Sequence, residues 1–192
     1  GGNCLNPPNV ARMRLSFDSM MSQWRSARGL DPERSDSSVE VFEGAGVAGR
    51  LATEMRQWYL HLLDTAPLRY LVLTDIAAKL QPCGDSDGTF STYTLPRDVR
   101  RVIDVTIEGF GRPVPVTDGA DSTWAGVTGN PYVRGNALGP RAFVSGDTLT
   151  VISDTPPVLT RVRAVTDPGD EEYIFDESAL SLIPGRISEC EL

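Results

Sequence analysis

A single histidine limits the nucleophilic chemistry that the chain can perform. His61 is the one side chain available as a general base of the Ser-His or Cys-His kind. It lies between Leu60 and Leu62, inside the segment with the strongest helical periodicity. A lone histidine in such a helix is usually a surface or core-edge residue. We therefore expect no catalytic residues and a protein that is not an enzyme.

Two acidic pairs offer the carboxylates that a glycosidase or a calcium loop needs. Asp85 and Asp87 form one pair, and Asp118 and Asp121 form the other. Both pairs stand in turns rich in glycine and serine, where aspartate commonly bonds to the local backbone. The segment around Asp85 also lacks the 12-residue pattern and the terminal glutamate of a calcium loop. Turn formation is the favoured interpretation, and we expect neither a metal ion nor a cofactor.

Two segments have features of phosphate-binding loops. Residues 44–49, GAGVAG, match the GxGxxG spacing and lead into a helix, but no βαβ repeat follows them. Small residues there favour a helix start that another helix can approach closely. The second segment, 130–143, contains Arg134, Arg141 and two prolines, and it leads into a strand. Since no helix N-terminus follows to hold a phosphate, we interpret it as a long excursion between strands.

Composition and charge narrow the functional class further. The 192 residues are 40% hydrophobic with a net charge of −8, so the chain can bury a core but offers no basic surface for nucleic acid. No apolar run approaches the length of a membrane span, and the first ten residues have no secretory pattern. Cys4, Cys83 and Cys190 are odd in number and widely spaced, which favours a reducing compartment over a disulfide framework.

The first third of the chain has helical periodicity. Phe17, Met20, Met21 and Trp24 recur on one helical face, with Ser16 or Asn9 as a cap and Gly29 as a stop. A second and stronger apolar stripe runs from residue 47 to residue 63, and Pro67 ends it. We expect three of its residues to form the helical core: Trp58, Tyr59 and Leu62.

The period changes to that of strands from Thr74 onward. Alternation over 76–80 and the β-branched segment 89–95 predict a hairpin, and 102–110 pairs with a short strand at 112–117 whose prolines suit an edge. Segments 142–153 and 158–166 form a second strand pair, with a turn at Gly146-Asp147. Residues 177–184 form a short helix.

These elements predict an α+β fold, in which N-terminal helices pack on a mostly antiparallel β-meander or small β-domain with a short C-terminal helix. The expected parts are an N-terminal segment with one amphipathic helix and a linker (1–45), a helical part (46–73), a β-rich part (74–176), and a short helix with a tail (177–192).

Three ordered motifs give the chain a family resemblance. They are WYLHLLDTAP at 58–67, LPRDVRRVIDVTIEGFGRPV at 95–114 and NPYVRGNALGPRAFVSGDTLTVI at 130–152. In this order they resemble the head-to-tail connector ring, or adaptor, proteins of tailed bacteriophages. The likeness is greatest to the ring proteins of crAss-like podoviruses and extends more distantly to tail tubular (gatekeeper) proteins. The first 45 residues match no part of that pattern, and Phe110 stands where the family has Trp before Arg-Pro.

The resemblance implies a virion structural protein in a ring of about twelve copies at the head–tail junction. Such a ring binds the portal protein on one side and a neighbouring ring or tail protein on the other. Genomic DNA only passes through it, no membrane is involved, and the protein is made in the host cytoplasm. We expect these residues to make subunit or partner contacts: Arg97, Arg100, Arg101, Arg112, Tyr132, Arg134 and Arg141. Two alternatives stay open: a secreted or surface β-rich binding module, and a carboxylate-based hydrolase.

Overall fold

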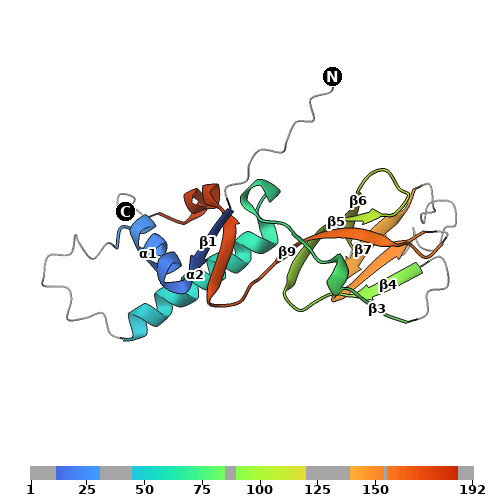
Figure 1. The fold of residues 1–192 in the computed structure, drawn as a ribbon. Helices are drawn as coiled ribbons and strands as arrows, with labels where there is room; N and C mark the ends of the chain where they lie inside the picture. The colour runs from blue at the N-terminus through green and yellow to red at the C-terminus, as the bar shows by residue number, and fades with distance from the viewer. Residues whose placement is uncertain (1–11, 31–44, 85–89, 120–138, 154, 186–192) are drawn as a thin grey trace, which may run out of the picture. The chain divides into compact units, whose positions relative to one another are not determined.

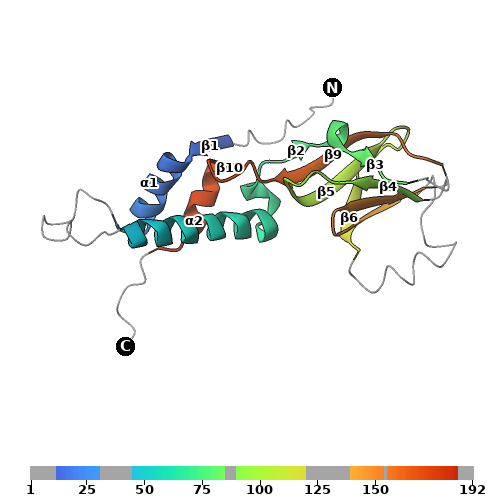
Figure 2. The same cartoon turned by 90° about the horizontal axis from the view of Figure 1, so that it is seen from below.

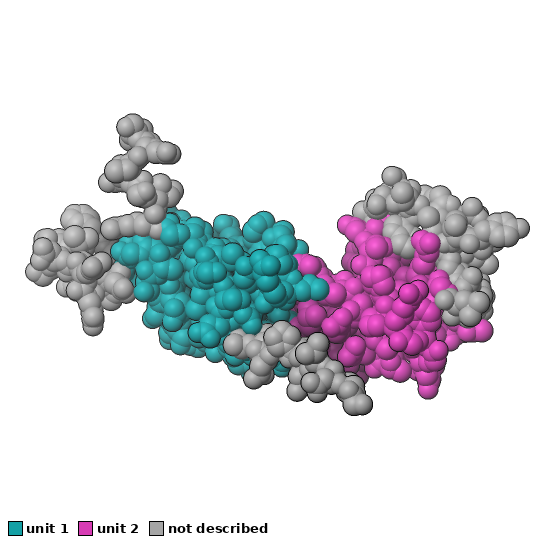
Figure 3. All heavy atoms as spheres, turned by 90° about the horizontal axis from the view of Figure 1, so that it is seen from above, with its two compact units in different colours: residues 1–72, 167–192 teal, residues 73–166 magenta. Residues whose placement is uncertain are grey.

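A computed structural model describes residues 12–30, 45–84, 90–119, 139–153 and 155–185 (Figure 1). The chain forms two compact units (Figure 3). Unit 1 comprises residues 1–72 and 167–192, and unit 2 comprises residues 73–166. Unit 2 is therefore an insertion between the two halves of unit 1. This division differs from the sequential parts expected from the sequence, because the strand after residue 170 belongs with the helices.

Unit 1 contains the two predicted helices, α1 (Phe17–Ala27) and α2 (Ala45–Thr65). The Ser16 side chain caps α1 by accepting a hydrogen bond from the Ser19 N–H at 3.3 Å. Gly29 follows the helix with a φ of 70°, a left-handed conformation that glycine adopts without strain. Both ends of α1 are thus as the sequence predicts, and Pro67 precedes the short 3₁₀ helix η2 (Leu68–Tyr70).

A two-stranded antiparallel sheet joins the two halves of unit 1. It pairs β1 (Arg12–Ser16) with β10 (Glu172–Asp176), two strands that the sequence analysis does not predict. Together with the helices, the sheet encloses an aromatic core. The largest fully buried side chains of this core are Trp24, Tyr59, Tyr173, Phe175, Met20 and Met55. The predicted C-terminal helix is the 3₁₀ helix η4 (Glu177–Leu182), which the Asp176 side chain caps.

Unit 2 is an eight-stranded sheet that curls into a half-barrel (Figures 1 and 2). The strand order is β2-β9-β5-β6-β7-β8-β4-β3. The strands are β2 (Thr74–Asp75), β3 (Gln81–Pro82), β4 (Phe90–Thr94), β5 (Val99–Ile107), β6 (Val114–Asp118), β7 (Arg141–Ser145), β8 (Thr148–Ile152) and β9 (Leu159–Thr166). Its core includes Ile76, Val105, Leu149 and Val162, all fully buried. The α+β class and the mostly antiparallel sheet are confirmed.

The short strand β6 lies inside the sheet order, so its assignment to an edge is wrong. Val114 and Pro115 pair with β5, whereas Val116, Thr117 and Asp118 pair with β7. Each half of β6 therefore has one neighbour, and Pro115, which has no N–H to donate, sits where the pairing changes sides. The pairing of β6 with β7 is parallel. Parallel neighbours require a crossover connection of a dozen or more residues, and this explains the long segment between the two strands.

Three other pairings differ from the sequence predictions. Residues 76–80 alternate in polarity but form the 3₁₀ helix η3 (Ala77–Lys79), and only β3 pairs with β4. Segment 142–153 is a hairpin by itself, β7 with β8, turning at Gly146 with a φ of 61°. Strand β9 pairs with β5 and β2 instead. Register shifts along β5 also interrupt its alternation, so the adjacent residues Asp104 and Val105 are both buried.

Candidate interaction surface

The described arginines that are expected to make partner contacts lie at the two ends of β5. Arg97 is exposed in the turn before β5, Arg100 is exposed on the strand, and Arg101 is half-buried. Arg112 and Arg141 are exposed beyond the other end of β5, at the starts of β6 and β7. The structure thus separates the five predicted contact residues that it describes into two groups. Tyr132 and Arg134 lie outside the described residues.

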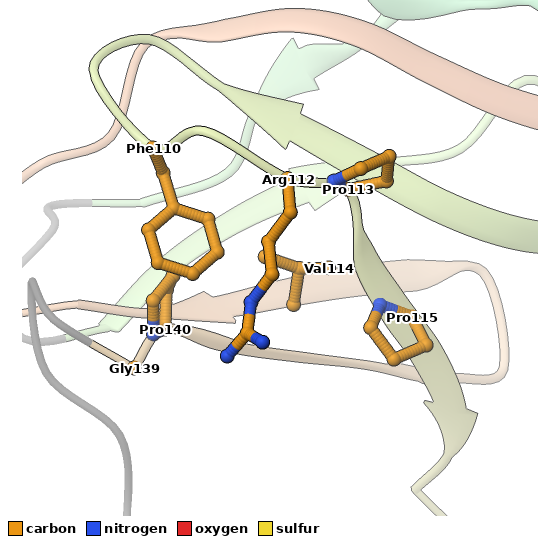
Figure 4. A pocket seen from close by; sticks show the side chains of 7 residues that line it. All are labelled: Phe110, Arg112, Pro113, Val114, Pro115, Gly139 and Pro140. Carbon is orange, nitrogen blue, oxygen red and sulfur yellow. The ribbon is translucent and has the colours of Figure 1, made fainter.

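Three adjoining hollows surround Pro140 in unit 2. The first is an open hollow of about 330 Å³, lined by Phe110, Arg112, Pro113, Val114, Pro115, Gly139 and Pro140 (Figure 4). The second, of about 280 Å³, extends from Phe110 and Pro140 to Pro156, Pro157 and Val158. The third, of about 210 Å³, includes Pro115, Pro140 and Arg141. We call the residues that line these hollows the Pro140 surface.

Local backbone chemistry explains the position of the Phe110 ring. Gly109 has a φ of 79°, which lets the chain turn sharply after β5. The Phe110 N–H donates to the Ile107 carbonyl at 3.1 Å and closes this turn. The Glu108 N–H donates to the Val158 carbonyl at 2.9 Å and ties the turn to the connection before β9. Phe110 and Arg112 therefore project side by side from the turn toward Gly139 and Pro140 (Figure 4).

The Pro140 surface combines rigid apolar groups with two cations. The Arg112 guanidinium carbon lies 5.6 Å from the centre of the Phe110 ring, within cation–π range. Val158 is 58% exposed, so a large apolar side chain faces solvent at one side of the surface. Proline side chains lose little conformational entropy on contact with a partner. Apolar hollows bordered by arginine are typical of surfaces that bind another protein.

The helical residues Trp58, Tyr59 and Leu62 lie in unit 1. Tyr59 and Leu62 are buried, and Trp58 is half-buried. The Trp58 ring centre is 5.7 Å from that of Trp24 and 6.3 Å from that of Phe175, and its indole N–H donates to the Leu182 carbonyl at 3.2 Å. These contacts belong to the packing of α2 against the rest of unit 1. The Tyr59 ring lies 4.8 Å from that of Tyr173, and burial raises the pKa of Tyr59 to about 12.

Two of the candidate catalytic groups, His61 and Asp118, lie within the described residues. His61 is exposed on α2, where its Nε2 lies 3.3 Å from the Thr65 hydroxyl. Asp118 is exposed at the end of β6, whereas Asp85, Asp87 and Asp121 lie outside the described residues. Across the described ranges, no group of three or more His, Cys, Asp or Glu side chains has a metal-binding arrangement. No described helix has the length and hydropathy needed to cross a membrane.

Sequence reasoning missed the apolar half of the candidate surface. It selected Arg112 and Arg141 but not Phe110, Pro140 or Val158, which make the hollows between them. The signal was the pair of Arg-flanked prolines, Arg112-Pro113 and Pro140-Arg141, at the starts of two strands. The starts of these two strands lie at the same end of the sheet because β6 and β7 are parallel.

No protein-family model matches the chain, and a search of curated proteins finds no match.

Proposed function

We propose that the protein is a virion structural protein that forms a homo-oligomeric ring at the head–tail junction of a tailed bacteriophage. One observation carries the proposal. Two of the three motifs that resemble connector rings, at 95–114 and 130–152, contribute the Arg-Pro and Pro-Arg pairs that border the Pro140 surface. Segments that define the resemblance therefore converge on a surface suited to protein contact.

The chemistry of the Pro140 surface fits a head-to-tail subunit interface. Such an interface joins two different patches, so each subunit needs a receiving surface and a separate inserting segment. Phe110, Pro140 and Val158 supply apolar area, and Arg112 and Arg141 supply donors for carboxylates of a neighbour. The chain also carries 26 acidic residues, whose carboxylates are the groups that these arginines would bind on a neighbouring copy.

The same negative charge suits a channel for DNA. A ring that DNA must pass through works best when its subunits do not retain phosphates by counterion release. The chain carries 26 acidic and 18 basic residues, so a non-specific hold on DNA is disfavoured overall. The expected partners are the portal protein on one side and a neighbouring ring or tail protein on the other, and the expected copy number of about twelve rests on the resemblance.

The test is assembly of the purified full chain. We expect closed rings by electron microscopy and a matching mass in solution, and co-sedimentation with the portal protein of the same virus. Arg112→Glu and Arg141→Glu should each shift the chain toward monomers while leaving the melting temperature unchanged, because both side chains are exposed. Arg161→Glu, an exposed arginine of β9 that lines none of the three hollows, is the matched control.

Two outcomes would count against the proposal. A chain that stays monomeric at every concentration, with or without portal protein, is not a ring subunit. Tight binding of a glycan or of calcium by that monomer would favour the binding-module alternative. Arg134→Glu tests the predicted role of segment 130–143 separately. If that variant assembles as the wild type does, segment 130–143 makes no subunit contact and serves only to connect two strands.

A further inference from the structure

The apolar stripe of α1 extends beyond the core of unit 1. Met20 and Trp24 are buried, whereas Phe17, one turn before Met20 on the same stripe, is 37% exposed. The helix therefore begins with an aromatic side chain at the surface. Since burying the rest of this side chain would remove more apolar area from water, contact with a partner that covers it would be favourable.

Two carboxylates lie next to Phe17. Asp18 follows it in the chain, and the Phe17 N–H donates to the Glu171 carbonyl at 3.0 Å, which holds Glu171 beside it. Both acidic residues are exposed, and neither has an ion-pair partner among the described residues. The neighbouring Glu172 differs, because it has a long ion pair with Arg14 at 3.9 Å. We call Phe17, Asp18 and Glu171 the Phe17 face.

The Pro140 surface of unit 2 has the complementary composition. Phe110 and Pro140 form part of the wall of its hollow of about 330 Å³ (Figure 4). Arg112 lines the same hollow, and Arg141 lines the adjoining one. Both arginines are exposed, and within the described ranges neither has an ion-pair partner. One aromatic side chain with two unpaired carboxylates thus corresponds to apolar hollows with two unpaired cations.

The other large apolar side chains that are exposed in unit 1 lack this complementarity. Leu68 is followed by the exposed Arg69, which would oppose the arginines of the Pro140 surface. Leu182 has no acidic residue within four positions of it in the sequence. Leu30 stands at the boundary of the described residues. Phe17 is also the aromatic member of this group, and aromatic side chains are the commoner anchors of protein interfaces.

We propose that the Phe17 face of one copy of the chain inserts into the Pro140 surface of the next copy. The Phe17 ring enters the hollow beside Phe110 and Pro140, and the two carboxylates bind the two arginines. The choice of a second copy rests on the proposed function. Unit 1 supplies the inserting face and unit 2 supplies the receiving surface, so the contact joins two different patches and repeats from subunit to subunit.

Charge reversal on both sides tests the contact. One full-length chain carries Asp18→Arg with Glu171→Arg, and a second carries Arg112→Glu with Arg141→Glu. Within either chain alone the two faces then have like charges, so self-association should weaken at least about a hundredfold. An equimolar mixture has opposite charges at every junction and should associate as the wild type does. Analytical ultracentrifugation measures the affinity, and native mass spectrometry should find equal numbers of the two chains in each assembly.

Matched variants separate the contact from general effects of substitution. Glu177→Arg reverses an exposed charge of unit 1 outside the Phe17 face and should leave association unchanged. Phe17→Ala should weaken association about tenfold or more, whereas Leu182→Ala, at a similarly exposed position, should change it little. Thermal melts establish that each chain is folded. If the two arginine substitutions unfold unit 1, Asp18→Asn with Glu171→Gln removes the same charges and should weaken association about tenfold.

The outcomes separate this inference from the proposed function. Rings formed by either charge-reversed chain alone would overturn the contact and leave the proposed ring standing. The same holds if the wild type forms rings but the two folded, reversed chains do not associate when mixed. A mixture that associates without ever closing into rings would support the contact and overturn the ring. Absence of association in the wild type and in the mixture would overturn both.

Discussion

Asp104 on β5 and Arg163 on β9 form an ion pair directly across the two strands. The Arg163 Nε donates to the two Asp104 carboxylate oxygens at 2.9 and 3.0 Å, and the neighbouring guanidinium nitrogen bonds to one of the same oxygens. Asp104 is 6% exposed. This hydrogen bonding raises the pKa of Arg163. The pair places a charged contact at the most extensive strand pairing of unit 2.

Loss of one partner of this pair should cost more than loss of both. Arg163→Leu leaves a buried carboxylate without its donor, and we expect a decrease of about 2–3 kcal/mol in the free energy of unfolding. Asp104→Leu combined with Arg163→Leu should recover part of that decrease. Urea unfolding of the two single variants and the double variant measures the coupling. Additive effects would mean that the pair contributes nothing to stability.

The raised pKa of Tyr59 predicts a loss of stability in alkaline solution. Burial is the main cause, and the folded-state value is about 12 against an ordinary value of 10.0. The unfolded state therefore releases the phenol proton at lower pH than the folded state does. The contribution of protonated Tyr59 to the free energy of unfolding is thus complete below pH 10 and disappears as pH rises toward 12. Its size is about 2–3 kcal/mol.

Comparison with Tyr59→Phe isolates this contribution, because Tyr93 and Tyr173 also have raised pKa values and titrate in both proteins. The difference in unfolding free energy between wild type and variant should shrink between pH 10 and pH 12. A difference that stays constant over this range would contradict the assignment.

Gly119 should tolerate no side chain. A Cβ atom there would lie 2.6 Å from Cδ2 of Phe143 and 3.0 Å from the Val144 carbonyl oxygen. The Gly119 N–H also donates to that carbonyl at 2.7 Å, so the backbone cannot move away without losing the bond. Gly119→Ala should lower stability by about 1–3 kcal/mol. Gly111→Ala, with no atom within 4 Å of the added Cβ, should be neutral or slightly stabilising in the same thermal melts.

Arg56 binds α2 to residues 167–170, the segment just before β10. Its guanidinium bonds to Asp167 at 2.5 Å, to Asp170 at 2.9 Å and to the Gly169 carbonyl at 3.1 Å. Lysine cannot reproduce this forked arrangement, so Arg56→Lys should cost about 2 kcal/mol. Hydrogen exchange should show faster opening of α2 and β10, with β5 and β8 unchanged. Arg50→Lys, at an exposed position of the same helix, is the control. If the two changes lower stability equally, the forked contacts of Arg56 are not the cause of the loss.

Local signals explain what the sequence could predict of the fold. Periodicity, the Ser16 cap and Gly29 define α1, and Gly146-Asp147 marks the turn that follows β7, although the pairing of β7 with β8 was not predicted. Each of these features depends on residues close together in the chain. The same local information selected Arg112 and Arg141 as expected contact residues.

Long-range pairing explains what the sequence could not predict. β1 is only five residues long and β10 pairs with it from the far end of the chain, so neither has a local partner to reveal it. Pro115 in β6 suggests an edge until β7 is known to pair with the other half of the strand. The Pro140 surface depends on that same parallel pairing, and no pattern along the chain encodes it.

The insertion of unit 2 between the halves of unit 1 dictates an order of events during synthesis. β1 and both helices leave the ribosome before residues 73–166, yet β10, the strand that completes their sheet, comes after all of them. Unit 2 has every strand of its sheet within one continuous segment and can fold as soon as β9 emerges. The nascent chain therefore holds Trp24, Met55 and Tyr59 without the Tyr173 and Phe175 rings until its last stage. During that interval a chaperone could bind the exposed aromatic surface. A chain truncated after β9 would contain a folded unit 2 joined to helices that lack β10.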